Sequence, residues 1–206
     1  PPPPPPRPTH FPYTTLFRSF YSGTILLGWI WFGLLVLLTG GYYAAYLYKF
    51  RGAPSLGSGG GVWLGTAAIA FLAIAMIHVG VHLVHTQPDR WVGFAASAWS
   101  VLGDPTYWPR LAHFVLAGLG FAALNAAWWA IRRAAAGEDV ETNTAIARTC
   151  WRWALWTTAL LIVDGFVLLA VLPLDVLLGV MRGGLATLAP LTVSIVLAIG
   201  LLVMLA

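Results

Sequence analysis

Charged residues are scarce in this chain: Asp, Glu, Lys and Arg together make up 9% of it, against roughly 25% in soluble domains. Apolar residues make up 59%, more than a water-soluble fold of this size can bury. The net charge of +4 comes from cations at the ends of apolar runs, so it indicates membrane topology and no nucleic-acid partner. The composition predicts an integral membrane protein whose solvent is the lipid bilayer.

Cysteine is also nearly absent. The chain has a single cysteine, Cys150, which excludes an internal disulfide. It stands between Arg148 and Arg152, and we interpret it as a small residue at a membrane boundary rather than a reactive thiol. The sequence places no cysteine or acidic residue where it would complete a zinc or copper site with the histidines described below.

The first 19 residues differ from the rest of the chain. Pro1–Pro6 is a homopolymer, and the string FPYTTLFRS at residues 11–19 is what a common sequencing-library adapter encodes. We predict that residues 1–19 are either an artefact or a disordered proline-rich tail. Residues 20–206 are predicted to form one helical transmembrane domain. Because an apolar run reaches Ala206, we expect this domain to be a fragment of a longer protein.

Long apolar runs predict membrane-spanning helices, because about 20 helical residues cross the hydrocarbon core. These runs exceed the length of a barrel strand, so the fold class is all-α. A shorter apolar run at residues 91–103 predicts an interfacial or re-entrant helix. The sequence therefore predicts an integral membrane bundle of five transmembrane helices plus a short interfacial helix. The predicted spans are residues 20–48, 62–85, 110–131, 151–171 and 185–206.

Cations at the span ends predict the orientation. One side of the membrane would hold Lys49, Arg51, Arg132, Arg133, Arg148 and Arg152, and the other only Arg90, Arg110 and Arg182. Cytoplasmic loops carry the excess of Lys and Arg. We therefore predict that loops 49–61 and 132–152 are cytoplasmic.

Four histidines form the main candidate site. His78, His82 and His85 are spaced i, i+4, i+7, so they share one face of a helix. His113 lies near the start of the next span, and antiparallel packing would bring all four imidazoles to the outer side of the membrane. Facing imidazoles commonly hold membrane b-type haem. We predict His82 with His113 as haem ligands and His78 with His113 as the second choice. The alternative is that these are interfacial polar residues.

Asp164 is a second candidate, because it lies well inside an apolar run. A carboxylate at this depth costs at least ~2.5 kcal/mol on insertion scales, so it should face the bundle interior. One reading is a proton relay, or a hydrogen bond to a cofactor or quinone. The other is a neutral carboxyl group bonded to a neighbouring helix, for example through Asn125 or Thr157.

A stripe of small residues supports a different role. Gly118, Ala122 and Ala126 recur every four residues, which is typical of close helix contacts in membranes. Such a seam would suit a scaffold subunit that supports a partner without a cofactor of its own.

Several short motifs resemble a known family. They are FYSGTILLGWIW at residues 20–31, the tyrosine-rich end at 42–50, PDRW at 88–91, DPTYWPRLAHF at 104–114 and LLAVLP at 168–173. In this order, over residues 20–182, they resemble bacterial multi-spanning membrane proteins distantly similar to subunit I of cytochrome bd quinol oxidases. That family carries Pro-Arg-x-x-His-Phe where Pro109–Phe114 stands, so the resemblance implies a role for Arg110 and His113. It implies nothing for the three histidines at residues 78–85.

The resemblance and the histidines together lead to an expected function. The chain would be a membrane subunit of a respiratory-type electron-transfer system in the bacterial inner membrane, with b-type haem or quinone near the outer face. Arg110 would pair with a haem propionate or a quinone oxygen, and other membrane or cytochrome subunits would be partners. The alternative is the non-catalytic scaffold subunit.

Overall fold

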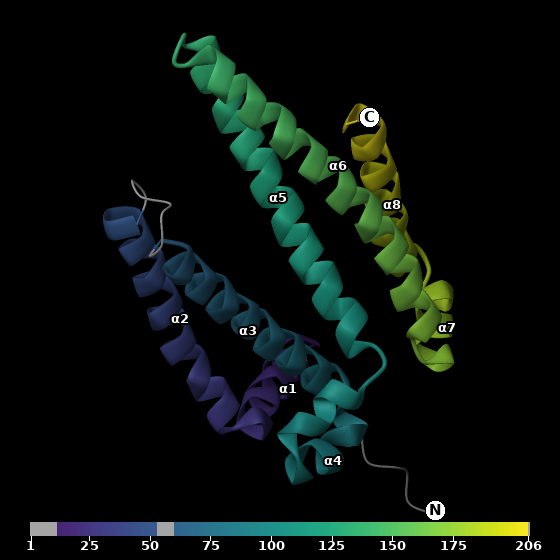
Figure 1. Ribbon diagram of the computed structural model, residues 1–206. Coiled ribbons are helices and arrows are strands. Elements are labelled where there is room, and N and C mark those ends of the chain that lie inside the picture. The colour runs from purple at the N-terminus through teal and green to yellow at the C-terminus, as the bar shows by residue number, and fades with distance from the viewer. Residues whose placement is uncertain (1–11, 53–59, 206) are drawn as a thin grey trace, which may run out of the picture. The chain divides into compact units, whose positions relative to one another are not determined.

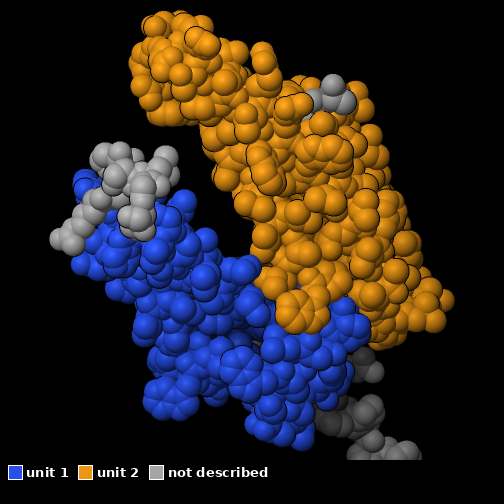
Figure 2. Space-filling view, in the orientation of Figure 1, with its two compact units in different colours: residues 1–107 blue, residues 108–206 orange. Residues whose placement is uncertain are grey.

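The computed structural model describes residues 12–52 and 60–205, and within these ranges the chain is helical with short connections and no strand. The main helices are α1 (Pro12–Leu27), α2 (Trp29–Leu47), α3 (Gly60–Thr86), α4 (Trp91–Ala96), α5 (Tyr107–Ala135), α6 (Val140–Val171), α7 (Leu174–Arg182) and α8 (Leu185–Leu205) (Figure 1). They belong to two compact units, residues 1–107 and 108–206 (Figure 2).

Helices long and apolar enough to cross a membrane are present in both units. In the described residues they are Trp29–Phe50, Gly61–Thr86, Tyr107–Ala135 and Val140–Val171. At most 39% of the most apolar window of each is buried, so apolar side chains cover the outside of these helices, as lipid requires. This confirms an all-helical membrane protein. The fifth predicted span is helical in α8, but its apolar stretch, Leu188–Met204, is shorter, so a count of five stays a prediction.

The first predicted span, residues 20–48, is not one continuous helix. The chain breaks at Gly28, whose φ of +52° lies in the region that side chains disfavour, and α2 starts afresh at Trp29. Hydropathy cannot detect this break because Gly28 stands inside an unbroken apolar run. Helix α1 begins at Pro12 and so includes residues 12–19 of the predicted tail, whereas residues 1–11 lie outside the described residues.

In unit 1, α2 and α3 run antiparallel. A Cβ atom on Gly41 would lie 3.2 Å from the Cβ of Ala70, which shows how closely the two backbones approach. At the other end of α2, the ring of Trp31 meets that of His78 edge-on at 5.7 Å. Helix α1 packs against the last turns of α3, where Gly23 faces His85. Helix α3 therefore packs mainly against α1 and α2.

The predicted interfacial helix at residues 91–103 is broken in two. Ser97 is extended and separates α4 from the 3-10 segment η3 (Ala98–Gly103). Phe94 and Val101 are buried, and the Trp91 indole N–H donates to the Val84 carbonyl at 2.8 Å. This link therefore folds back onto the end of α3 instead of lying as one regular helix.

In unit 2, α5 and α6 form a hairpin with a turn at residues 136–139. Helix α6 begins at Val140, where the Asp139 side chain accepts a hydrogen bond from the Thr142 backbone N–H at 3.3 Å. The polar stretch 133–149, which falls within the predicted loop 132–152, is thus mostly a continuation of the two long helices. Helix α8 packs against α6, and α7 packs against α8.

Candidate functional site

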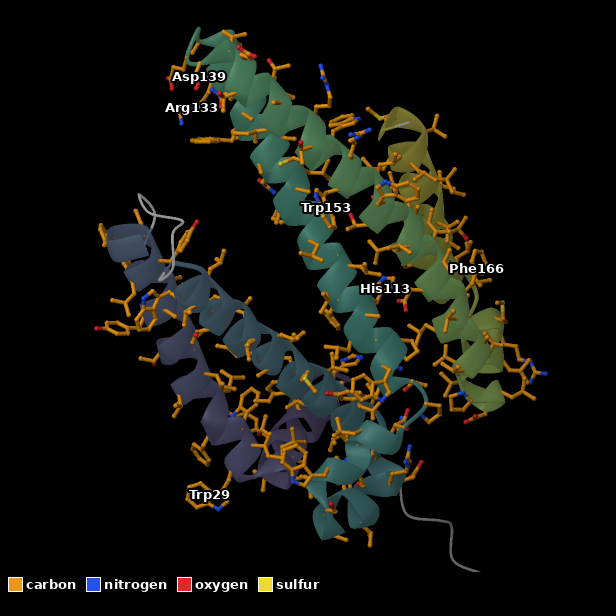
Figure 3. All side chains as sticks on the ribbon, viewed as in Figure 1. Trp29, His113, Arg133, Asp139, Trp153 and Phe166 are labelled. Atoms are coloured by element: carbon orange, nitrogen blue, oxygen red, sulfur yellow. The ribbon has the colours of Figure 1, made fainter. Side chains whose placement is uncertain are left out.

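The hairpin of unit 2 brings together His113 and Asp164. His113 lies two turns into α5 and Asp164 about two turns before the end of α6. Figure 3 shows His113 on α5. The distance from its Nδ1 atom to Asp164 Oδ2 is 3.0 Å. The Asp164 side chain is 12% exposed, whereas that of His113 is 47% exposed. The carboxyl group is thus enclosed by the hairpin while the imidazole is half open to the surroundings.

A seven-residue register explains why these two residues meet. Seven residues separate His113 from Gly120 on α5, and seven separate Thr157 from Asp164 on α6. A Cβ atom on Gly120 would lie only 2.9 Å from Thr157 Oγ1, so both pairs are contacts of one antiparallel seam. Because seven residues make about two helical turns, residues at this spacing keep facing the same neighbour.

The pair has a defined chemistry. The direction of this hydrogen bond depends on the ring tautomer: opposite an ionised carboxylate, which only accepts hydrogen bonds, His113 donates from Nδ1. Donation from Nδ1 fixes the ring orientation and leaves the lone pair on Nε2 for a ligand or a proton. An imidazole backed by a carboxylate suits metal ligation and proton acceptance equally well.

The prediction that Asn125 or Thr157 binds the Asp164 side chain was wrong, because its partner in the structure is His113. The Asn125 amide donates to the Phe121 carbonyl of its own helix at 2.8 Å. The Thr157 hydroxyl likewise donates to the Trp153 carbonyl at 2.8 Å. Sequence reasoning named both His113 and Asp164 but did not pair them. The signal that was missed is the recurrence of polar residues every seven positions on α6, at Asn143, Cys150, Thr157 and Asp164.

The other three histidines of the candidate site, His78, His82 and His85, lie on α3 in unit 1. His78 and His82 are exposed, and the rings of His82 and His85 are 5.5 Å apart at 34°. His85 is half-buried and meets the Phe20 ring edge-on at 6.4 Å. Its Nδ1 atom is buried without a hydrogen-bond partner. The described residues contain no group of three or more His, Cys, Asp or Glu side chains placed to hold a metal ion.

The predicted pairing across the two apolar runs stays a prediction. His82 and His78 belong to unit 1, and His113 to unit 2. Arg110, the residue that the family resemblance adds, is half-buried in the first turn of α5. It therefore shares a helix with His113, one turn away.

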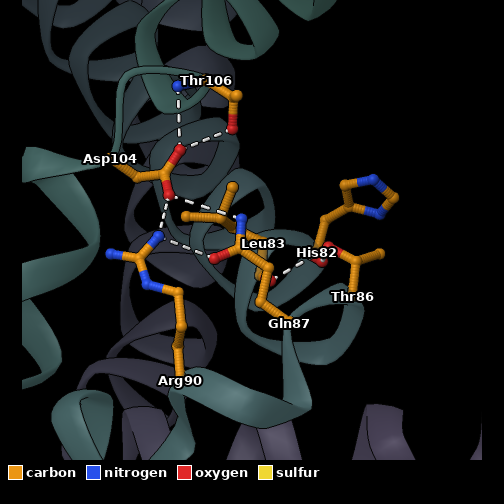
Figure 4. A network of polar contacts seen from close by, with 7 residues as sticks. All are labelled: His82, Leu83, Thr86, Gln87, Arg90, Asp104 and Thr106. Carbon is orange, nitrogen blue, oxygen red and sulfur yellow. Dashed lines mark hydrogen bonds and ion pairs between the residues drawn. The ribbon is translucent and has the colours of Figure 1, made fainter. Parts of the chain in front are cut away.

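A second polar cluster surrounds Asp104 in the link of unit 1. Asp104 is 3% exposed and forms an ion pair with Arg90. It also accepts from the backbone N–H of Thr106 at 2.8 Å and from its hydroxyl at 2.6 Å, and from Gln87 at 3.4 Å (Figure 4). Burial alone would raise the pKa of Asp104, but these hydrogen bonds outweigh it and hold the pKa below its ordinary value.

The Asp104 cluster is structural. Its donors, Gln87, Arg90 and Thr106, all lie in the link between α3 and α5, so the cluster fastens residues 87–106 together just ahead of α5. The sequence analysis did not identify this cluster. The available signal for this cluster was the two-residue spacing of Asp104 and Thr106. It is typical of a turn in which an Asp side chain accepts from the backbone N–H two residues on.

Comparison of the chain with models of protein families, with curated proteins and with solved structures finds no match. The resemblance to cytochrome bd subunit I is thus a prediction that rests on the motifs alone.

Proposed function

We propose that this protein is a membrane subunit of a respiratory-type electron-transfer system, in which His113 and Asp164 bind b-type haem or the head group of a quinone. The observation that supports this proposal is the 3.0 Å contact between the two side chains inside an apolar hairpin. Ionisable groups at such positions are expensive in lipid and commonly functional. The half-exposed imidazole is the part of the pair that a ligand can reach.

The residues fit a haem ligand. His113 would supply Nε2 to the iron, and Asp164 would hold the ring through Nδ1, as carboxylates do behind ligating histidines. The second ligand predicted from the sequence is His82, with His78 as the next choice, and both side chains are exposed on α3. Arg110, one turn before His113, would neutralise a propionate. Bound haem would supply one-electron transfer at a potential set by these ligands.

The residues also fit a quinone. His113 Nε2 would accept the hydroxyl proton of a reduced head group, and Asp164 would stabilise the resulting imidazolium, so the pair would act as the proton relay. Arg110 would bind the second oxygen of the ring. A quinone supplies coupled two-electron and two-proton chemistry, which requires a proton acceptor inside the membrane.

The finer topology belongs to this proposal. We place five spans in the bacterial inner membrane, with loops 49–61 and 132–152 in the cytoplasm and His113 towards the outer face. Other membrane or cytochrome subunits would complete the electron path. The six cations that flank those two loops support this orientation.

Reduced-minus-oxidised absorbance spectra of the purified protein, expressed from its complete gene, test the proposal. We expect a Soret band that shifts on reduction and is lost in His113→Ala but kept in Asn125→Ala, a control on the same helix. If no band appears, bound quinone is extracted and quantified in the same three proteins. Absence of both haem and quinone would overturn the proposal and favour the scaffold function, for which the exposed Gly118 on α5 is the supporting observation.

A further inference from the structure

A shallow groove runs along one face of α6, near the cation-rich end of the hairpin. It has a volume of about 450 Å³ and is lined by Thr149, Arg152, Trp153 and Trp156. These positions are three, four and seven residues apart, so they share a helix face. Trp153 is 60% exposed and Trp156 is 65% exposed. The groove therefore presents a guanidinium group and two indole rings to the outside.

The arginines near this groove differ in how their charge is compensated. Arg133 donates to Glu138 at 2.6 Å and stacks over Trp129, and Arg132 stacks over Trp128 at 4.5 Å. Arg148 and Arg152 are exposed, and among the described residues no carboxylate lies within ion-pair distance of either. Because they are four residues apart, the two uncompensated charges lie on one side of α6.

The groove also lies at the boundary of the apolar part of α6. From Trp153 to Val163 the helix carries no charged residue, and indole rings at such a boundary match the depth of lipid head groups. Farther along the same face, Leu160 is 50% exposed and Val163 is 60% exposed. The groove at Arg152 thus continues along α6 into an exposed apolar surface formed by Leu160 and Val163.

The hydrogen-bond donors of the groove indicate which kind of ligand it can bind. Guanidinium and indole N–H groups only donate, so they match an oxygen-rich anion such as a phosphodiester. The Thr149 hydroxyl donates to the Ala145 carbonyl at 3.0 Å, so it adds no donor. A zwitterionic head group would bring a cation beside Arg148 and Arg152, which is unfavourable.

We propose that this groove binds an anionic phospholipid of the bilayer. The phosphate would lie on Arg152 and Arg148, the head group against Trp153, and one acyl chain along Trp156 and Leu160. This site is separate from His113 and Asp164, so it does not depend on the proposed electron-transfer function.

Lipid binding to the delipidated protein tests this proposal, with phosphatidylglycerol and phosphatidylcholine as probes in native mass spectrometry. We expect at least tenfold tighter binding of phosphatidylglycerol. The Arg148→Gln/Arg152→Gln variant should lose about 25-fold of that affinity, since each interfacial arginine contributes roughly fivefold. Arg182→Gln removes the same kind of charge from α7 and should leave binding unchanged.

Two further measurements separate binding in the groove from a general attraction between charges. Trp156→Leu keeps both arginines and should weaken phosphatidylglycerol binding several-fold, because the acyl chain loses its contact with the indole ring. Circular dichroism establishes that each variant is folded. Equal binding of the two lipids, or unchanged binding in the double variant, would overturn the proposal. So would displacement of phosphatidylglycerol by inorganic phosphate at equal concentration, since the site would then recognise a free anion.

Discussion

His113 and Asp164 stabilise each other in the α5–α6 hairpin. An aspartate at this depth is unfavourable by about 2.5–3.5 kcal/mol on insertion scales, and the imidazole gives it a hydrogen-bond donor at 3.0 Å. The carboxylate in turn fixes the ring of a residue that is half exposed. Neither residue needs a partner elsewhere in the chain to account for its position.

The first prediction concerns this pair. His113→Ala should lower the free energy of unfolding by about 1–3 kcal/mol, because it leaves the enclosed carboxyl group without its donor. Unfolding by SDS titration in mixed micelles measures the change. Asn125→Ala, on the same helix, should change it by less than about 0.5 kcal/mol. The His113→Ala/Asp164→Ala double variant should cost less than the two single variants added together; strict additivity would contradict the pairing.

The second prediction concerns pH. The pKa of Asp104 is held below the ordinary value of 3.8 in the folded state, so its ionised form stabilises the fold. That contribution is complete above the unfolded pKa and is lost as the pH falls through the lower, folded pKa. The free energy of unfolding of the wild type should therefore decline below about pH 4. Asp104→Asn should be less stable than the wild type at neutral pH and should lack this part of the decline. Identical pH profiles of the two proteins would show that Asp104 does not contribute to stability in this way.

Among the elements, the α5–α6 hairpin depends on one close approach. Gly120 is buried, and a side chain there would meet Thr157. Gly118, only two residues earlier, is exposed and has nothing within 4 Å of its added Cβ. The packing seam thus runs through Gly120 and not through the predicted stripe that starts at Gly118.

These two glycines give the third prediction. Gly120→Ala should destabilise the hairpin by about 1–3 kcal/mol through overpacking. Gly118→Ala should be neutral, or stabilising by up to about 1 kcal/mol, because alanine is the better helix former. The same SDS titration measures both variants, and equal effects at the two positions would show that the seam does not pass through Gly120.

Hydropathy predicted the helices but not their local geometry. Helices α3 and α6 end at Thr86 and Val171, within one residue of the predicted ends at 85 and 171, because polar residues or prolines stop the apolar runs there. The break at Gly28 was not predictable in this way, since glycine interrupts a helix only through its backbone conformation. The His113–Asp164 contact needs the helix register, which the seven-residue spacing on α6 carries but mean hydropathy does not.

On the scale of the whole molecule, the chain contains two compact units that each include a pair of long apolar helices. Residues 89 and 138 flank α5, so a membrane-spanning α5 must separate them. The proposed topology puts residue 89 outside and residue 138 in the cytoplasm.

The fourth prediction tests this arrangement. In a Cys150→Ser background, Asp89→Cys should react with a membrane-impermeant maleimide added to intact cells, and Glu138→Cys should react only after the membrane is permeabilised. Asp89 and Glu138 are both exposed, so accessibility on its own side is assured for each. Labelling of both positions in intact cells would contradict a transmembrane α5.

The order of His113 and Asp164 along the chain bears on biosynthesis. Because α5 precedes α6 in the chain, His113 is synthesised before Asp164 and would be available to it during membrane insertion. The later helix, which would enter lipid reluctantly by itself, can then partition together with the earlier one as a single preassembled hairpin. The contacts at His113 and Gly120 would then help to bring α6 into the membrane.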